Sequence, residues 1–147
     1  MYPIKIISIG KIKNQNLNIE FDELLRRIPR IENITLKEVK NSNINLVKDK
    51  EFESFKKYLS SENFVILLTE KGKNFTSKGL FNKLSKIEKP IIFLISGPYG
   101  PSESLISQVD LSLSLSQMTF THEQALYILA EQLYRVHCFE SGKEYSK

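Results

Sequence analysis

Short apolar runs alternate with longer amphipathic stretches, and this alternation constrains the fold more than any other feature of the chain. The short runs predict strands over residues 4–9, 34–39, 64–68, 91–95 and 111–116. The stretches with helical spacing predict helices over residues 15–28, 47–59 and 77–87, with two more that begin near Glu103 and at His122. Strands and helices that alternate in this way are typical of a single α/β domain, residues 1–147, with a mainly parallel sheet flanked by helices.

The length and composition of the chain exclude several classes of protein. Its 147 residues suit one domain, and no run approaches the ~20 apolar residues of a membrane-spanning helix. The N-terminus lacks a basic region followed by a long apolar stretch, so we expect no signal peptide and a cytoplasmic protein. One cysteine fits a reducing compartment, and together with two histidines it cannot form a standard structural zinc site, so we expect no metal.

The formal net charge of +4 is compatible with a nucleic-acid partner, although scattered lysines often serve only solubility. Three of the four arginines lie close together, at Arg26, Arg27 and Arg30. This cluster either contacts phosphate or forms the solvated end of a helix, and the sequence leaves both alternatives open.

In open α/β sheets, ligands bind at the carboxyl ends of the strands, so the loops that follow strands are the places to search for a site. These loops are residues 10–16, 69–74, 96–102 and 116–121. The segment Ser96–Pro101 has two glycines, which permit positive φ and a close approach of a ligand to the backbone. Its spacing differs from the phosphate-binding GxGxxG and from a P-loop, so it is either a tight turn or a ligand contact.

The last helix begins beside the fourth of these loops. Thr121 and Gln124 match a capping-box pattern, so the helix should begin at His122, run to about Phe139 and stop at Gly142. His122 either helps to cap this helix or acts as a positioning or acid–base group.

Farther along the same helix, Glu131 and Arg135 are four residues apart and could simply pair on the surface. His137 and Cys138 are adjacent, so their side chains point about 100° apart and do not form a Cys–His dyad by themselves.

Several segments, taken together and in this order, resemble the bacterial ribosomal RNA large-subunit methyltransferase H family, small single-domain members of the SPOUT methyltransferases. The resemblance covers essentially the whole chain. The segments that carry it are Gly10-Lys11, Gly72-Lys73, Ile-Ser-Gly-Pro-Tyr-Gly at 95–100, Leu-Ser-Leu-Ser-Gln-Met-Thr-Phe-Thr-His at 113–122, Glu-Gln-Leu-Tyr-Arg at 131–135, and Tyr145.

The resemblance implies a C-terminal trefoil knot whose loops bind S-adenosyl-L-methionine in a bent shape. It also implies a substrate, the N3 atom of a pseudouridine in helix 69 of 23S rRNA, methylated within the assembled 70S ribosome. The family works as a homodimer in which the C-terminal tail of one subunit helps to complete the site of the other.

The resemblance also implies the residues of the site. On the substrate side we expect Tyr145, Arg135 and Lys147, with His122 as a further catalytic candidate. The positions that match the cofactor-binding residues of the family are Leu68, Gly97, Ser116, Gln117, Met118, Thr119, Phe120 and Thr121.

Three positions depart from the pattern of the family. Ser146 stands where a histidine is usual, and a serine cannot replace an imidazole as a base near neutral pH. Leu126 stands where an arginine is usual, which removes a cation from the expected site, and Thr121 replaces a proline. Proton removal from N3 could then rely on water, Tyr145 or His122.

Two alternatives follow from these observations. The first is a catalytically weakened SPOUT-like dimer that binds ribosomal RNA as a module, prompted by Leu126 and Ser146. The second is an unrelated flavodoxin-like protein that binds a nucleotide or flavin. The absence of a phosphate loop after the first strand, where the sequence is Gly10-Lys11-Ile12-Lys13, counts against the second.

Overall fold

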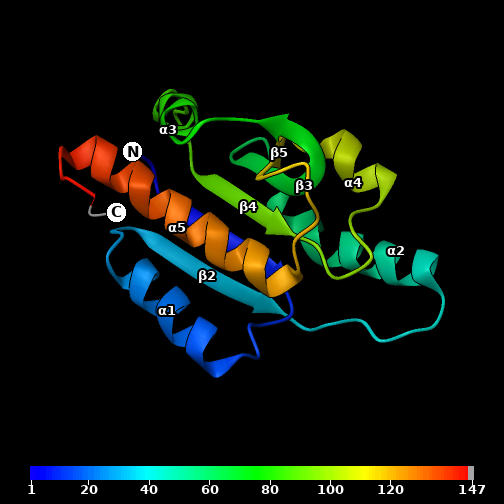
Figure 1. The fold of residues 1–147 in the computed structure, drawn as a ribbon. Coiled ribbons are helices and arrows are strands. Elements are labelled where there is room, and N and C mark those ends of the chain that lie inside the picture. Colours follow the sequence, from blue (N-terminus) through cyan, green and yellow to red (C-terminus); the bar gives the residue numbers. More distant parts are fainter. Residues whose placement is uncertain (146–147) are drawn as a thin grey trace.

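The computed structural model describes residues 1–145, which form one five-stranded sheet with helices on both faces (Figure 1). The strands are β1 (Ile4–Ile9), β2 (Ile31–Leu36), β3 (Phe64–Asn74), β4 (Ile91–Ile95) and β5 (Leu111–Ser114). They lie in the order β2-β1-β4-β3-β5, and every neighbouring pair is parallel. The predicted α/β class is confirmed, while the trefoil knot stays a prediction of the resemblance.

The helices divide between the two faces of the sheet. They are α1 (Gln15–Arg26), α2 (Ile44–Phe55), the 3-10 helix η1 (Lys56–Tyr58), α3 (Ser77–Ser85), α4 (Glu103–Gln108) and α5 (His122–Ser141). Side chains of α1, α3 and α5 pack into one core cluster, and side chains of α2, η1 and α4 pack into the other. None of the helices within residues 1–145 is long and apolar enough to cross a lipid bilayer.

The central strand β4 contributes to both cores. All five of its residues are buried, as expected for a parallel strand that is covered on both faces. Phe93 packs in the cluster on the α5 side, whereas Leu94 packs in the other cluster with Phe55 and Leu105. This alternation along β4 is the period of two that any strand has, and it makes β4 the centre of the fold.

Helix α5 begins and ends where the sequence predicts. The Thr121 hydroxyl accepts the Gln124 N–H, and the Gln124 side chain accepts the Thr121 N–H, both at 3.2 Å. These two bonds form the predicted capping box. Gly142 ends the helix with a φ of +70°, a conformation that glycine adopts without steric cost.

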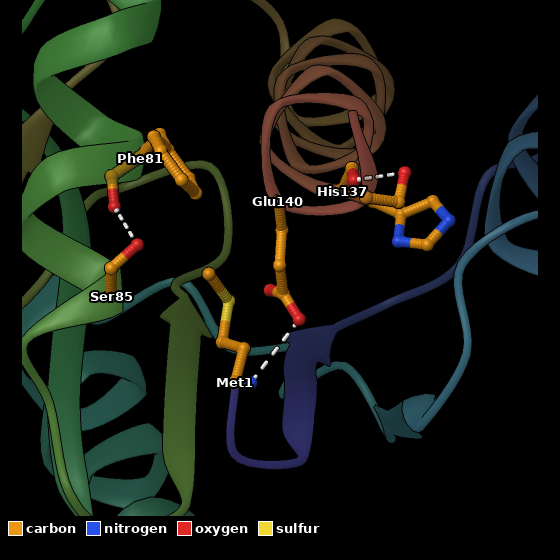
Figure 2. Close-up of polar contacts among 6 residues, drawn as sticks. Met1, Phe81, Ser85, His137 and Glu140 are labelled. Atoms are coloured by element: carbon orange, nitrogen blue, oxygen red, sulfur yellow. Dashed lines mark hydrogen bonds and ion pairs between the residues drawn. The ribbon is translucent and has the colours of Figure 1, made fainter. Parts of the chain in front are cut away.

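Both ends of α5 are tied to the N-terminal part of the chain. At its start, Glu123 Oε1 accepts the N–H groups of Lys13 and Asn14 at 3.0 and 3.1 Å. At its other end, the Met1 amine lies 3.2 Å from the Glu140 carboxylate (Figure 2). The helix therefore has a fixed position along the sheet.

Two predicted elements are displaced. Strand β2 begins at Ile31, three residues before the predicted start, because Arg30 turns the chain with a φ of 60° and its carbonyl accepts the Ile4 N–H. That bond sets Ile4 opposite Ile31. Helix α2 begins at Ile44, three residues before the predicted start, because the Asn43 side chain caps it by accepting the Leu46 N–H.

Two arginines of the cluster form ion pairs with a glutamate at the end of the same helix, α1. Arg26 and Arg27 lie 3.1 and 3.4 Å from the carboxylate of Glu23, and all three side chains are exposed. This pairing matches the solvated-helix-end alternative, while contact with phosphate stays untested.

Candidate functional site

A pocket of about 350 Å³ lies where the middle of β3 meets the carboxyl ends of β4 and β5. Its walls come from residues 68–71, residues 95–101 and the loop after β5, with His122 and Ala125 of α5 beside them. Two of the four loops singled out in the sequence, residues 96–102 and 116–121, meet there, because parallel strands end at the same edge of a sheet. Residues 69–74 were predicted to be a third loop, but the structure has them as the bulged second half of β3, which reaches the same pocket. The size lies within the range of small-molecule sites, which is roughly 300–1,000 Å³.

The loop after β4 is a tight turn that also lines this pocket. The Gly100 N–H donates to the Gly97 carbonyl at 3.1 Å, and Gly100 has a φ of +78°. The two alternatives left open for this loop, a turn or a ligand contact, are therefore compatible with each other. Within residues 1–145, the buried hydroxyl oxygen of Ser96 has no hydrogen-bond partner.

His122 connects two of the loops through main-chain carbonyls. Its Nδ1 lies 3.1 Å from the Ser96 carbonyl oxygen, and its Nε2 lies 3.4 Å from the Gly10 carbonyl oxygen. Carbonyl oxygens only accept, so each ring nitrogen can bond there only as a donor. A neutral imidazole has one N–H, so in that form it donates to one of the two carbonyls, and the ring is held between the two loops as a positioning group.

A β-bulge shapes the wall contributed by β3. Leu68 and Lys73 both align with Leu113 of β5, so the residues between them leave the regular pairing. Gly72 lies against the partner strand so closely that a Cβ would approach the Ser112 carbonyl to 2.6 Å. The bulge carries Glu70 to the pocket, where its carboxylate accepts the Thr119 hydroxyl at 2.5 Å.

The loop after β5 is held by its own serines. The Ser114 hydroxyl donates to the Ser116 carbonyl at 2.8 Å, and the Met118 N–H donates to the Ser116 hydroxyl at 3.0 Å. These bonds leave the Met118 side chain 74% exposed at the rim of the pocket.

The structure brings most of the predicted cofactor-binding residues to this pocket. Six of the eight line it: Leu68, Gly97, Ser116, Met118, Thr119 and Phe120. Within the described chain, Gln117 and Thr121 are not among the lining residues, and Thr121 is the N-cap of α5.

The predicted substrate-side residues lie elsewhere. Arg135 is 13 residues beyond His122 on α5, which places the two about 20 Å apart at 1.5 Å per residue. Tyr145 folds back onto this end of the helix, with the Arg135 guanidinium 4.1 Å from the centre of its ring. Lys147 lies outside the described residues.

Arg135 and Tyr145 form a partly buried cluster with Glu131. Arg135 Nε donates to Glu131 Oε1 at 2.6 Å, and the two side chains are 28% and 18% exposed, so the pair is not a freely solvated one. Burial and then the Glu131 carboxylate raise the pKa of the Tyr145 hydroxyl, which Arg135 lowers to a smaller extent. In this state the hydroxyl is a proton donor near neutral pH.

Leu126, one of the departures from the family pattern, is 1% exposed and belongs to the core on the α5 side. Its neighbour Ala125, not Leu126, lines the pocket. Within this structure the replacement therefore changes a core position.

The sequence patterns predicted no role for two polar residues of this region. Glu70 reaches the pocket only through the bulge in β3, and no local sequence pattern predicts that bulge. Glu51 lies under Gly97 and is 4% exposed. A signal for Glu51 was present, because it stands four residues from both Val47 and Phe55 and therefore on the buried stripe of its helix.

Comparison with known proteins adds three findings. The chain matches the family model described as "Predicted SPOUT methyltransferase" over residues 2–146. It is 40% identical over 144 residues to "Ribosomal RNA large subunit methyltransferase H" of Prochlorococcus marinus (strain NATL2A), covering 97% of this chain and 94% of the relative. A protein of the same description from Desulfotalea psychrophila is 33% identical over 150 residues, with 97% and 98% covered.

Among solved structures, the chain is similar to "a probable methylase family protein" from Haemophilus influenzae Rd KW20, with a TM-score of 0.66. The match covers 99% of this chain and 71% of that one at 11% sequence identity, so it concerns the fold alone.

Proposed function

Because the chain belongs to the ribosomal RNA large subunit methyltransferase H family of SPOUT methyltransferases, we propose that it methylates N3 of a pseudouridine in helix 69 of 23S rRNA, with S-adenosyl-L-methionine as methyl donor. We further propose that it acts on the assembled 70S ribosome in the cytoplasm. The observation that supports this function best is the pocket where the bulge of β3 meets the loops after β4 and β5, since six of the eight predicted cofactor residues line it.

The lining of the pocket suits the proposed cofactor. Leu68 and Phe120 offer apolar surface, and Thr119 and Glu70 offer polar atoms. The unpartnered Ser96 hydroxyl oxygen, buried within the described residues, could bond a polar group of a ligand. When bound, S-adenosyl-L-methionine supplies an electrophilic methyl group on a sulfonium. The protein's contribution is then chiefly to hold donor and acceptor in line, which needs rigid loops.

The residues near N3 have different tasks in this proposal. His122 holds the loops at Ser96 and Gly10, because both of its ring nitrogens face carbonyl oxygens. Tyr145, with its raised pKa, and Arg135 stabilise negative charge on the base as the N3 proton leaves to water. Lys147, outside the described residues, is proposed to join them on the substrate side.

This division of tasks requires two copies of the chain. Arg135, with Tyr145 packed against it, lies about 15 Å along α5 from Ala125, which lines the pocket of its own chain. They can serve a pocket only if it belongs to a second subunit, so we propose a homodimer with composite sites.

Mixing variants tests the composite site. Phe120→Ala damages the pocket and Tyr145→Phe damages the substrate side, so each alone should methylate poorly. After the two are unfolded and refolded together, heterodimers carry one intact site and about a quarter of wild-type activity should return. No recovery would show that each site is built within one chain.

The reaction itself is tested by methyl incorporation from labelled cofactor into 70S ribosomes that lack the modification, with the methylated base identified by mass spectrometry. Phe120→Ala should lose incorporation, and Ile19→Ala, an exposed change on α1, should not. Cofactor binding without methyl transfer to any ribosome preparation would favour the RNA-binding module instead.

A further inference from the structure

Glu51 is a buried carboxylate that the proposed function does not yet use. It lies on α2 and is 4% exposed, between Val47 and Phe55 on the buried stripe of that helix. Burial is the main cause that raises its pKa, and nearby Glu38 raises it further. Burying a carboxylate costs free energy unless its oxygens accept hydrogen bonds. The hydrogen bonds of Glu51 therefore indicate its role.

The bond that Glu51 makes is to the pocket. Its Oε1 accepts the Gly97 N–H at 3.2 Å. A Cβ placed on Gly97 would lie only 2.6 Å from the other carboxylate oxygen, Oε2. The carboxylate is therefore in close contact with Gly97, and this contact depends on the absence of a side chain there. Gly97 is both a predicted cofactor residue and part of the pocket wall.

The Ser96–Gly97 peptide is thus held from two elements. His122 of α5 contacts the Ser96 carbonyl at 3.1 Å, and Glu51 of α2 accepts the next N–H group along the chain. The Gly97 carbonyl in turn accepts from Gly100 and closes the turn. With one side chain on each side, this peptide at the start of the turn cannot move without breaking a bond to a helix.

We propose that Glu51 is a positioning residue of the cofactor site, which holds the Gly97 N–H and thereby keeps the turn at residues 97–100 in the shape that binds the methyl donor. The inference rests on the proposed function, because it assumes that the pocket binds this cofactor. Glu51 is not itself among the residues that line this pocket, so it acts through Gly97, which is.

Two variants separate positioning from plain stability. Glu51→Met removes the acceptor but keeps the length of the side chain, and a buried charge replaced by an apolar group of similar volume often leaves stability unchanged or raises it. Glu51→Gln keeps an acceptor oxygen. The matched control is Glu53→Gln, an exposed change on the same helix.

The first measurement is binding of S-adenosylhomocysteine and S-adenosyl-L-methionine by calorimetry, with thermal unfolding of every variant. Glu51→Met should bind at least about tenfold more weakly with little change in Tm, since the acceptor that holds the Gly97 N–H is lost. Glu51→Gln should recover most of the affinity, and Glu53→Gln should match wild type. In the methylation assay, KM for the cofactor should rise while KM for ribosomes stays unchanged.

Wild-type affinity in Glu51→Met would overturn the inference, as would a loss of affinity that follows a fall in Tm in both Glu51 variants. Hydrogen exchange of the Gly97 amide, followed by NMR without any cofactor, tests the same contact independently. That amide should be protected in wild type and Glu51→Gln and exchange faster in Glu51→Met. If wild type binds no cofactor at all, the proposed function fails, and the exchange result still decides whether Glu51 holds the turn.

Discussion

Gly72 is the position where one added methyl group should disturb the site most. A Cβ there would lie 2.6 Å from the carbonyl carbon and oxygen of Ser112, whereas ordinary contact begins at 3.4 Å, so β3 and β5 would have to separate by about 0.8 Å. The obstructing atoms are backbone and cannot rotate away. Overpacking costs roughly 1–3 kcal/mol, and we expect Gly72→Ala to lose about 3 kcal/mol of unfolding free energy.

Urea denaturation followed by circular dichroism measures this loss, and Gly142→Ala is the matched control. Gly142 has a φ of +70°, but a Cβ there meets no atom of residues 1–145 within 4 Å. Its replacement should therefore cost only the left-handed backbone conformation, about 1–2 kcal/mol. Because the bulge at Gly72 also carries Glu70 to the pocket, Gly72→Ala should weaken cofactor binding and Gly142→Ala should not.

A smaller loss for Gly72→Ala than for Gly142→Ala would refute this reasoning. It would mean that β5 yields freely at Ser112, and that the packing of the bulge does not determine the wall of the pocket.

Three further predictions concern single side chains. Thr121→Ala removes the N-cap bond of α5 and should cost about 1 kcal/mol in urea denaturation; no loss would mean that Gln124 alone caps the helix. Burial raises the pKa of Glu51 above its usual 4.5, so the folded state holds this proton more tightly than the unfolded state does. The unfolding free energy of wild type minus that of Glu51→Gln should therefore be highest below pH 4.5 and should fall as pH rises through the raised pKa of Glu51. A difference between the two proteins that does not change with pH would contradict this. Tyr145→Phe should slow methylation of 70S ribosomes by about tenfold or more without changing cofactor affinity, and an unchanged rate would remove the hydroxyl from the mechanism.

Local sequence patterns predicted the elements whose boundaries are set by short-range chemistry. Strands β1 and β4 occupy the predicted residues because each is a mostly apolar run with a breaker at one end, Gly10 after β1 and Pro90 before β4. Helix α5 begins as predicted because its capping box involves only Thr121 and Gln124, three residues apart.

Elements whose boundaries depend on pairing with a distant strand were predicted less well. Strand β2 begins at Ile31 because Arg30 bonds to Ile4 of β1, 26 residues earlier in the chain. Strand β3 was predicted to end at Leu68, but it continues to Asn74 because β5 pairs with it again beyond the bulge. Apolar periodicity reports burial and contains no information about such bonds.

The candidate site divides in the same way. The parallel sheet was enough to predict that the loops after β4 and β5 meet, because strand ends at one edge converge whatever the side chains are. The six predicted residues that line the pocket were implied by the resemblance to the family and not by this geometry. The contacts of Glu51 with Gly97, of Glu70 with Thr119 and of His122 with two carbonyls arise only when helices and loops are packed in space. Hydrogen bonds between residues 26 to 112 positions apart depend on distances of a few ångströms, which tertiary packing sets and the spacing of residue types along a chain does not.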